Sequence, residues 1–364
     1  MPQGAPRPRR AAATIEEVAR AAGVSRQTVS NALNAPQRVR PDTLTRVRAA
    51  IERLGYRPDQ SARSLRTGAR RTLGYLAPVD DPYDPNPLMA GFLEALVDAA
   101  AAAGYRLLLF RPAPGTTDAR PAIDELIAAR QVDGLVLADV LRDDPRVGHV
   151  ARTGVPFAAF GRTGPGEPQH WVDIDNGAAT AGVVRHLADR GHRRVAFAGP
   201  AGEELPWMAA RRAGFAAEAA RLGLTAELPG GAPGAAGPGG PAGTAAGRSP
   251  AGASAGPGVP QLRALLQGPD RPTAVAAGSD LAALAVYEAV RAEGLVVGRD
   301  VAVVGFHDTP LCRHLHPALS SVRLPLRAIA AGLVGLLLTQ IRGETVRGEG
   351  LVLQTELVVR ASSG

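Results

Sequence analysis

The most constraining feature of the sequence is a regular alternation of short apolar runs with helical stretches, which starts near residue 72 and continues to residue 306. The apolar runs, such as "YRLLLF", have the length of buried strands, and the stretches between them, such as 87–103, have helical spacing. Strands that alternate with helices form parallel sheets. Two successive series, the second from "WVDID" to "DVAVVGF", predict an α/β core of two doubly wound lobes.

The size of this core agrees with two lobes, because about 290 residues exceed one ordinary hydrophobic core. Doubly wound sheets bind ligands at the carboxyl ends of their strands, and a cleft between two lobes suits a small molecule. The sequence therefore predicts a small-molecule site between the lobes.

Charge is distributed unevenly along the chain. Residues 1–71 hold 15 arginines and 5 acidic residues, a net charge of +10, whereas the remaining residues hold 26 arginines and 29 acidic residues, a net charge of −3. This asymmetry indicates a small basic head that contacts a polyanion. A coding bias toward arginine would act on both parts alike, so it does not account for the difference.

Several features predict a soluble protein of a reducing compartment. The single cysteine, Cys312, excludes an internal disulfide. No apolar run reaches the ~18 residues needed to span a membrane, and the basic N-terminus lacks the apolar segment of a signal peptide. We therefore expect a cytoplasmic, nucleoid-associated protein whose residues 1–12 form a disordered basic arm.

Residues 13–58 have the pattern of three short helices. Thr14 and Glu17 can form a capping box, and Gly23 suits the left-handed position that ends the first helix. Ser25 is the expected N-cap of the second helix. The third helix starts at about Pro41, and its apolar stripe consists of Leu44, Val47, Ile51 and Leu54. Two short helices joined by a tight glycine-containing turn, followed by a third, predict an all-α helix-turn-helix head.

The second helix, "RQTVSNALN", carries polar donors and no carboxylate, as suits a helix that lies in the major groove of DNA. Arg26 can make a bidentate contact with guanine and Gln27 with adenine, while Asn31, one turn further on, can reach the next base. Short polar side chains of this segment suit phosphate oxygens, namely Ser25, Thr28, Ser30 and Asn34. The alternative interpretation is an ordinary polar helix on an enzyme surface.

These residues resemble a known family of DNA-binding proteins. The stretch from "TIEEVARAAGVSRQTVSNALN" to "YRPDQSARSLRTG" closely resembles the head of the lactose repressor/galactose repressor (LacI/GalR) family of transcriptional regulators, over about 55 residues. The resemblance implies that Arg26, Gln27 and Asn31 read bases.

The hinge at 59–71 resembles the hinge helix of the same family. A helix of about two turns is marginal in water by itself, so we expect it to order only on DNA and beside a partner hinge. The resemblance implies that Ala62, Arg63 and Leu65 face the minor groove, where Leu65 acts as an apolar wedge. Asp59 stands where the family usually has Asn.

The remainder of the chain resembles the periplasmic-binding-protein-like core of this family, in stretches such as "WVDIDN" and "RGHRRVAFAGP". In that fold the chain crosses between the lobes three times. The implied lobes are about 72–161 with 320–342 for the first, and about 162–319 with 350–360 for the second. Residues 229–260 are almost wholly Pro, Gly, Ala and Ser, which predicts a disordered linker, either in place of a strand or inserted beside its remnant.

The resemblance also implies five effector-binding residues, Trp207, Arg211, Ser279, Asp280 and His307. Trp207 suits stacking on a sugar ring, and Arg211 belongs to the R-x-x-G-aromatic pattern of the family. His307 stands where the family has an Asp. Either Asp308 has taken over that role, or the pocket favours an effector with an anionic group, which Arg211 can grip bidentately. A neutral imidazole can orient a hydroxyl, and its protonation would tighten binding toward lower pH.

Together these features predict a sequence-specific DNA-binding transcriptional regulator, a repressor that binds a pseudo-palindromic operator as a homodimer and responds to a sugar or sugar derivative. We expect no catalytic residues, cofactor or metal. "GASAG" lacks the strand-turn-helix context of a hydrolase nucleophile, and "CRHLH", although spaced for zinc, resembles a surface loop. The alternative class is a soluble sugar-binding protein or a sugar-modifying enzyme with a doubly wound core.

Overall fold

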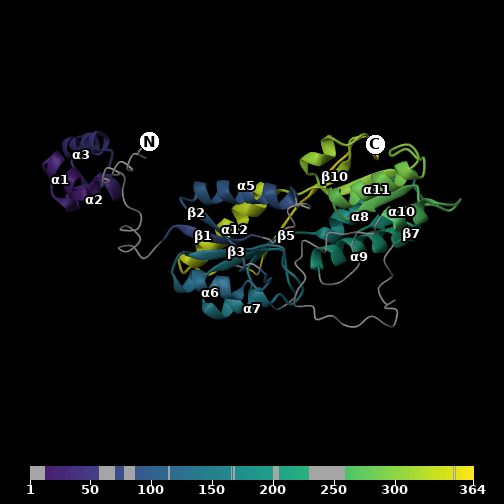
Figure 1. The fold of residues 1–364 in the computed structure, drawn as a ribbon, viewed down its shortest axis with the longest axis horizontal. Helices are drawn as coiled ribbons and strands as arrows, with labels where there is room; N and C mark the ends of the chain where they lie inside the picture. The colour runs from purple at the N-terminus through teal and green to yellow at the C-terminus, as the bar shows by residue number, and fades with distance from the viewer. Residues whose placement is uncertain are drawn as a thin grey trace, which may run out of the picture. The chain divides into compact units, whose positions relative to one another are not determined.

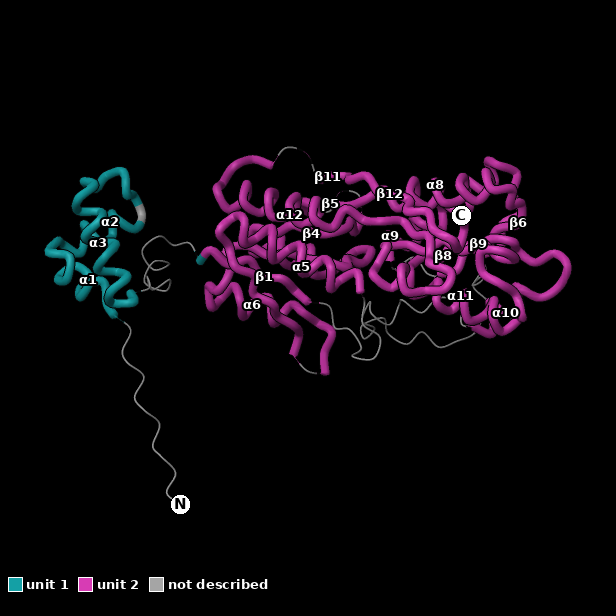
Figure 2. The backbone as a smooth tube through the Cα atoms, turned by 90° about the horizontal axis from the view of Figure 1, so that it is seen from above, with its two compact units in different colours: residues 1–70 teal, residues 71–364 magenta. Residues whose placement is uncertain are grey.

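The structure is a computed structural model. It describes residues 13–56, 70–77, 87–113, 115–164, 166, 169–199, 205–228, 259–346, 348 and 350–364. The chain divides into two compact units, residues 1–70 and 71–364 (Figure 2). The arm predicted at 1–12 and the hinge residues 59–69 lie outside the described residues.

The first unit is the predicted helix-turn-helix head. It consists of α1 (Ile15–Ala22), α2 (Arg26–Asn34), the 3-10 turn η1 (Pro36–Arg38) and α3 (Pro41–Leu54). The capping box is confirmed, because the Glu17 backbone N–H donates to Thr14 Oγ1 at 3.2 Å and the Thr14 N–H donates to Glu17 Oε2 at 2.7 Å. Gly23 ends α1 with a φ of 65°, in the left-handed region where glycine carries no steric cost.

The core of this unit is small and apolar. Val18, Val29 and Val47 are fully buried between the three helices. Leu54, predicted as part of the buried stripe, is instead 37% exposed, because it is the last residue of α3 and Ala50 closes the core before it.

The second unit contains the two predicted α/β lobes, each built on a six-stranded sheet (Figure 1). The first sheet has the order β11-β5-β4-β3-β1-β2 and is parallel throughout. Its strands are β1 (Thr72–Leu76), β2 (Arg106–Phe110), β3 (Gly134–Leu137), β4 (Phe157–Phe160), β5 (Trp171–Ile174) and β11 (Gly350–Leu353). One face is covered by α5 (Pro87–Ala102) and α12 (Leu326–Ile341), the other by α6 (Arg120–Ala128) and α7 (Pro145–Thr153).

The second sheet has the order β12-β10-β9-β8-β6-β7, with only β12 antiparallel to its neighbour. Its strands are β6 (Arg194–Ala198), β7 (Thr225–Glu227), β8 (Ala274–Ala277), β9 (Ala302–His307), β10 (Ser320–Arg323) and β12 (Glu356–Val358). The helices α8 (Asn176–Asp189) and α9 (Pro206–Arg221) cover one face, and α10 (Val259–Leu266) and α11 (Asp280–Ala292) cover the other. Both lobes are therefore doubly wound, as predicted.

The predicted lobe boundaries are corrected by the strand pairings. β5 pairs with β4 and β11, so it belongs to the first lobe rather than the second. β10 pairs with β9 and β12, so it belongs to the second lobe, and β11 belongs to the first. The chain crosses three times, but at residue 175, at 324–325 and at 354–355. These positions follow from which sheet edge each strand completes, and the family-like stretches do not specify that edge.

The low-complexity segment is bounded by regular structure. β7 precedes it at the edge of the second sheet, and α10 follows it. Val259 and Pro260, predicted as disordered, form the first turn of α10, while 229–258 lies outside the described residues. In the described part of the chain, every helix is too short or too polar to cross a bilayer.

The helices α8 and α9 approach each other more closely than any side chain would permit. A Cβ placed on Gly214 would overlap the backbone of Gly177, including its carbonyl oxygen. The contact between the two glycines therefore sets the distance between these helices. Asn176, at the start of α8, and Arg211, in the middle of α9, are held at hydrogen-bond distance in this way.

Candidate functional site

The outer surface of α2 carries the predicted base-reading side chains. Ser25 caps the helix by accepting a hydrogen bond from the Thr28 N–H at 3.1 Å, and the two hydroxyls lie 2.8 Å apart. Arg26 follows with its side chain 71% exposed, and Gln27 Nε2 donates to Asn31 Oδ1 at 3.1 Å. Arg26 and Gln27 are exposed and Asn31 is half-buried, and Gln27 and Asn31, one turn apart, lie side by side on the helix.

Arg26 has one acidic neighbour, which the sequence pattern of α2 alone does not reveal. Its guanidinium lies 3.7 Å from the carboxylate of Glu16 in α1, and both side chains are well exposed. An exposed ion pair of this kind contributes little free energy. The arginine can therefore leave Glu16 for a guanine edge at small cost.

Not all of the predicted phosphate contacts fit the structure. Ser30 is 7% exposed, so it is turned toward the core of the head and does not present its hydroxyl to a phosphate. It follows Val29 on the buried side of the helix. The side chain of Asn34 and the hinge residues Ala62, Arg63 and Leu65 lie outside what the structure describes.

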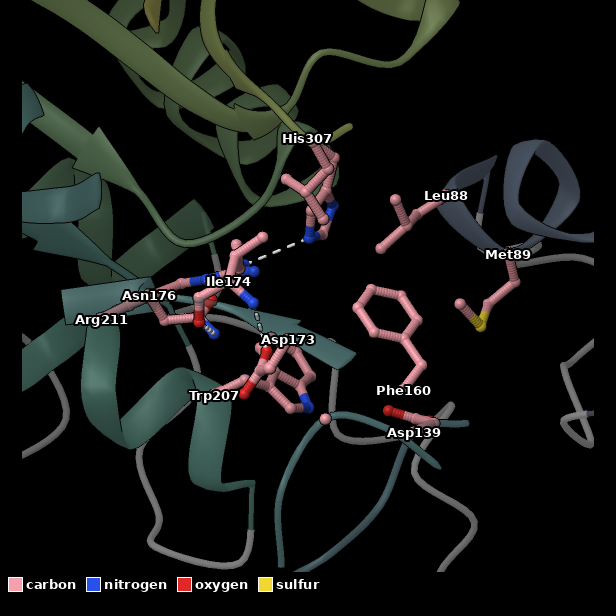
Figure 3. Close-up of a pocket in the computed structure, with 12 residues that line it drawn as sticks. Leu88, Met89, Asp139, Phe160, Asp173, Ile174, Asn176, Trp207, Arg211 and His307 are labelled. Carbon is pink, nitrogen blue, oxygen red and sulfur yellow. Dashed lines mark hydrogen bonds between the residues drawn. The ribbon is translucent and has the colours of Figure 1, made fainter. Parts of the chain in front are cut away.

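A pocket of about 520 Å³, including its open mouth, lies between the two lobes (Figure 3). The residues that line it are Leu88, Met89, Asp139, Phe160, Gly161, Asp173, Ile174, Asn176, Trp207, Arg211, His307 and Leu324. Most of these residues follow or end β3, β4, β5, β9 and β10, which is the sheet edge where doubly wound folds bind ligands.

Arg211 is the central polar residue of the pocket. It is 3% exposed, its Nε donates to Asn176 Oδ1 at 2.8 Å, and its Nη1 donates to the Gly278 carbonyl at 2.6 Å and to His307 Nε2 at 3.1 Å. Its guanidinium carbon lies 3.6 Å from the centre of the Phe306 ring and 4.9 Å from that of Trp207. Burial lowers the pKa of Arg211 to about 9, although the charges of Asp173 and Asp280 act in the opposite direction.

His307 faces Arg211 from the end of β9 (Figure 3). Because a guanidinium has no lone pair to offer, His307 Nε2 accepts the bond and the neutral ring carries its proton on Nδ1. Burial and the neighbouring Arg211 charge hold the pKa of His307 well below its usual value of 6.5. This shift disfavours protonation of the ring and so argues against the expectation that protonation of His307 tightens binding toward lower pH.

Asp308 does not replace the missing pocket carboxylate. Its side chain is 2% exposed and pairs with Arg323 Nε and Arg360 Nη2, each at 2.7 Å. It is therefore bound among strands rather than directed to a ligand. Both His307 and Asp308 have positive φ values, 113° and 52°, a backbone conformation that costs energy in residues other than glycine.

The prediction of Ser279 and Asp280 as effector residues is corrected, since neither lines the pocket. The Ser279 hydroxyl caps α11 by accepting from the Ala282 N–H at 3.0 Å. Asp280 is 1% exposed and accepts hydrogen bonds from the Thr309 N–H, the Thr309 hydroxyl and the Ser321 hydroxyl at 2.6–2.8 Å. It fixes the loop after β9 to β10, which is a structural role.

Two pocket carboxylates were not predicted from the sequence. Asp173, in β5, accepts from Arg162 Nε at 3.0 Å and from the Ile174 N–H at 2.8 Å, and burial raises its pKa. Asp139 follows β3 with a φ of 53°, and its carbonyl accepts from Arg146 Nη2 at 2.9 Å. Their signal in the sequence was an Asp at the carboxyl end of a predicted strand.

The "CRHLH" segment does not converge on a metal. Cys312 is buried, where burial raises its thiol pKa to about 12, whereas His314 and His316 are exposed. Across the part of the chain that the structure describes, no group of three or more His, Cys, Asp or Glu side chains is arranged to hold a metal ion.

We expect His307 to make the stability of the protein dependent on pH. The folded state keeps the ring neutral, whereas the unfolded chain takes up a proton near pH 6.5, so stability falls as the pH is lowered through that value. The loss is at most about 1.4 kcal/mol per pH unit. Thermal unfolding between pH 7.5 and 5.5 should show a steeper decline for the wild type than for His307→Gln. The exposed control His314→Gln should follow the wild type, and equal slopes for all three proteins would contradict the assignment.

Comparison with known proteins agrees with both units. Residues 14–59 match the family described as bacterial regulatory proteins, lacI family. Residues 72–230 match the periplasmic binding proteins and sugar binding domain of the LacI family, and residues 184–363 match a periplasmic binding protein-like domain.

Full-length relatives show the same organisation. The chain is 32% identical to the HTH-type transcriptional regulator CelR of Thermobifida fusca, over 97% of this chain and 99% of that protein. It is 29% identical to the HTH-type transcriptional repressor CytR of Escherichia coli strain K12, over 97% of this chain and 96% of that one. Among solved structures, a lac repressor dimer bound to operator and the anti-inducer ONPF matches with a TM-score of 0.74 at 25% identity, over 96% of this chain and 99% of that one. From its head, its core and these full-length relatives, the chain belongs to the LacI family of bacterial regulatory proteins.

Proposed function

We propose that this protein is a transcriptional repressor that binds a pseudo-palindromic operator as a homodimer and changes its affinity for DNA when a sugar or sugar derivative binds between the lobes. The observation that carries the proposal is the set of polar side chains on α2, with Arg26 and Gln27 exposed and Asn31 half-buried, in a chain that also contains a small-molecule pocket between its lobes. Two heads are needed because each recognition helix reads one half-site.

In the head, Arg26 and Gln27 lie in the first turn of α2, the part of a recognition helix that comes closest to base edges. We assign these two residues and Asn31 to base reading. Ser25 and Thr28, whose hydroxyls lie together at the start of the helix, are assigned to phosphate oxygens.

In the core, the pocket has the composition of a sugar site. Trp207 and Phe160 offer aromatic surface for the apolar face of a sugar ring, while Asp139, Asp173 and Asn176 offer polar groups for hydroxyls. One solved structure that resembles the chain, with a TM-score of 0.65 at 28% identity, is a transcriptional regulator CelR-cellobiose complex. Cellobiose is therefore the first neutral probe to test.

The proposal is tested by selecting sites from random DNA with the full-length protein, followed by gel-shift titration with and without cellobiose and other sugars. We expect a palindromic consensus and at least one sugar that changes operator affinity. By linkage, operator must then change the affinity for that sugar by the same factor. A protein that enriches no palindrome but binds sugars would be a soluble sugar-binding protein, and one that converts them would be an enzyme.

We expect Arg26→Ala to relax the base preference at one position of each half-site. A bidentate arginine-guanine contact contributes ~1–3 kcal/mol of discrimination, so the selected consensus should lose one guanine. The matched control is Arg53→Ala, which removes an exposed arginine from the last turn of α3. Site selection should return the wild-type consensus for the control, and an unchanged consensus for Arg26→Ala would rule out this reading of α2.

A further inference from the structure

Arg211 differs from other arginines in the interior of the core by the absence of an acidic partner. Arg146 pairs with Asp144 at 2.6 Å and Arg360 pairs with Asp308 at 2.7 Å, although both arginines are less deeply buried. Among the residues that the structure describes, no carboxylate forms an ion pair with Arg211. Its acceptors are an amide oxygen, a backbone carbonyl and a neutral imidazole. Asp173 and Asp280 act on Arg211 through their charges without forming an ion pair, so they offset the loss of its hydration only in part.

The guanidinium also retains unused donor capacity on the pocket side. Nε and Nη1 make all of its hydrogen bonds within the described chain, which leaves the two N–H groups of Nη2. Because Nε2 of His307 accepts from Arg211, the neutral ring offers its second nitrogen, Nδ1, as a donor. Both side chains line the pocket, so two donors, one of them charged, are available to a ligand, with His307 Nδ1 on the side of the ring away from Arg211 (Figure 3).

Neither of the two carboxylates that line the pocket forms an ion pair with Arg211 in the described chain. Asp173 is neutralised by Arg162 at 3.0 Å and accepts the Ile174 N–H. Asp139 follows β3 in the first lobe, on the loop that Arg146 binds, whereas Arg211 and His307 belong to the second lobe. Figure 3 shows Leu88, Met89 and Phe160 across the cavity from His307 and Arg211. A ligand in this pocket thus meets apolar surface on one side and, on the other, a guanidinium that forms no ion pair within the described chain.

We propose that the effector is an anionic sugar derivative, that its carboxylate or phosphate binds to Arg211 Nη2, and that His307 Nδ1 donates to another oxygen of the same ligand. This inference rests on the proposed function and assigns the chemical class of the effector. Arginine suits such a group because a hydrogen bond from its charged Nη2 to an anionic oxygen is stronger than one to a neutral acceptor. His307 determines the specificity, because a neutral acceptor at this position orients Arg211 without neutralising its positive charge. An aspartate at the same position would supply that counter-charge internally and exclude an anionic ligand.

The test is isothermal titration calorimetry with the full-length protein and matched probes that differ in one group. The panel pairs D-glucose with D-glucuronate and D-glucose 6-phosphate, D-galactose with D-galacturonate and D-galactose 6-phosphate, and cellobiose with cellobionate. We expect an anionic member of at least one set to bind at least tenfold more tightly than its neutral counterpart. The acid and phosphate arms distinguish a carboxylate from a phosphate as the recognised group.

His307→Asp and His307→Asn form the decisive pair of variants, since they are equal in size and differ in charge. His307→Asp should weaken the preferred anionic ligand at least tenfold relative to His307→Asn, and should lose the preference for the anionic member of the set. His307→Asn should keep that preference, because Arg211 remains unneutralised. Thermal unfolding of both variants verifies that each is folded.

The inference is overturned if a neutral sugar binds the wild type more tightly than every anionic counterpart, if no anionic member binds at all, or if the Asp and Asn variants bind the anion equally. Operator selection on the same preparation separates this failure from that of the proposed function. A protein that selects a palindrome and releases it in response to a neutral sugar would leave the proposed function intact and reject the anionic effector.

Discussion

Gly214→Ala is expected to destabilise the core by about 3 kcal/mol, at the upper end of the ~1–3 kcal/mol typical of overpacked substitutions. The added methyl group would overlap the backbone of Gly177, and backbone cannot rotate away as a flexible side chain can. The helices α8 and α9 must therefore separate. Separation would lengthen the 2.8 Å hydrogen bond between Arg211 Nε and Asn176 Oδ1, so the variant should also lose effector binding.

Urea unfolding and ligand titration of the variant measure both effects. Gly335→Ala is the matched control, because Gly335 lies in the helix α12, is exposed, and has no atom within 4 Å of an added Cβ. In that helix the alanine should be neutral or stabilise the protein by up to ~1 kcal/mol. If Gly214→Ala unfolds at the wild-type urea concentration, the close contact of α8 and α9 does not determine stability.

Asp280→Ala is expected to cost about 3–5 kcal/mol, comparable to breaking a buried charged network. The carboxylate is 1% exposed and accepts three hydrogen bonds from Thr309 and Ser321. Its removal leaves these donors buried without an acceptor, which costs more than the bonds themselves contribute. The loop after β9, which carries Asp308, should then lose its fixed conformation.

This prediction also distinguishes a structural role of Asp280 from an effector-binding role. Unfolding free energies measured in urea should fall for Asp280→Ala, while Asp189→Ala, which removes an exposed carboxylate from the end of α8, should change little. The affinity of the folded fraction for ligand should remain measurable. If the variant had wild-type stability but no longer bound ligand, Asp280 would be an effector-binding residue rather than a structural one.

The elements of the fold were predictable because their signals are local. The capping box of Thr14 and Glu17 and the left-handed Gly23 follow from residues three to nine positions apart. The lobe crossings were displaced because the short sequences of β5, β10 and β11 do not specify which sheet they join. Only the neighbouring strand decides their lobe, and that neighbour lies far away in the sequence.

The pocket residues were predictable where the sequence matches the motifs of the LacI family. Trp207, Arg211 and His307 line the pocket, whereas Ser279 caps α11 and Asp280 binds the loop after β9 and β10. Asp139 and Asp173 were missed because a carboxylate after a strand is common, and convergence from separate strands is a three-dimensional property. Ser30 was misplaced because small polar residues are found on either side of a short helix.

The crossings at residue 175 and at 324–325 lie at the wall of the pocket, since Ile174, Asn176 and Leu324 line it. Arg323 connects the second of these crossings to the third, through Asp308 at 2.7 Å and Glu356 at 3.0 Å. A ligand here touches the pivot of the two lobes rather than their outer rims. A small displacement near a hinge moves the distant parts of a lobe much further. A sub-ångström adjustment at Leu324 is therefore enough to rotate one lobe against the other. Effector binding would then act directly on the segments that connect the two lobes, and no relay of side chains through either lobe would be required.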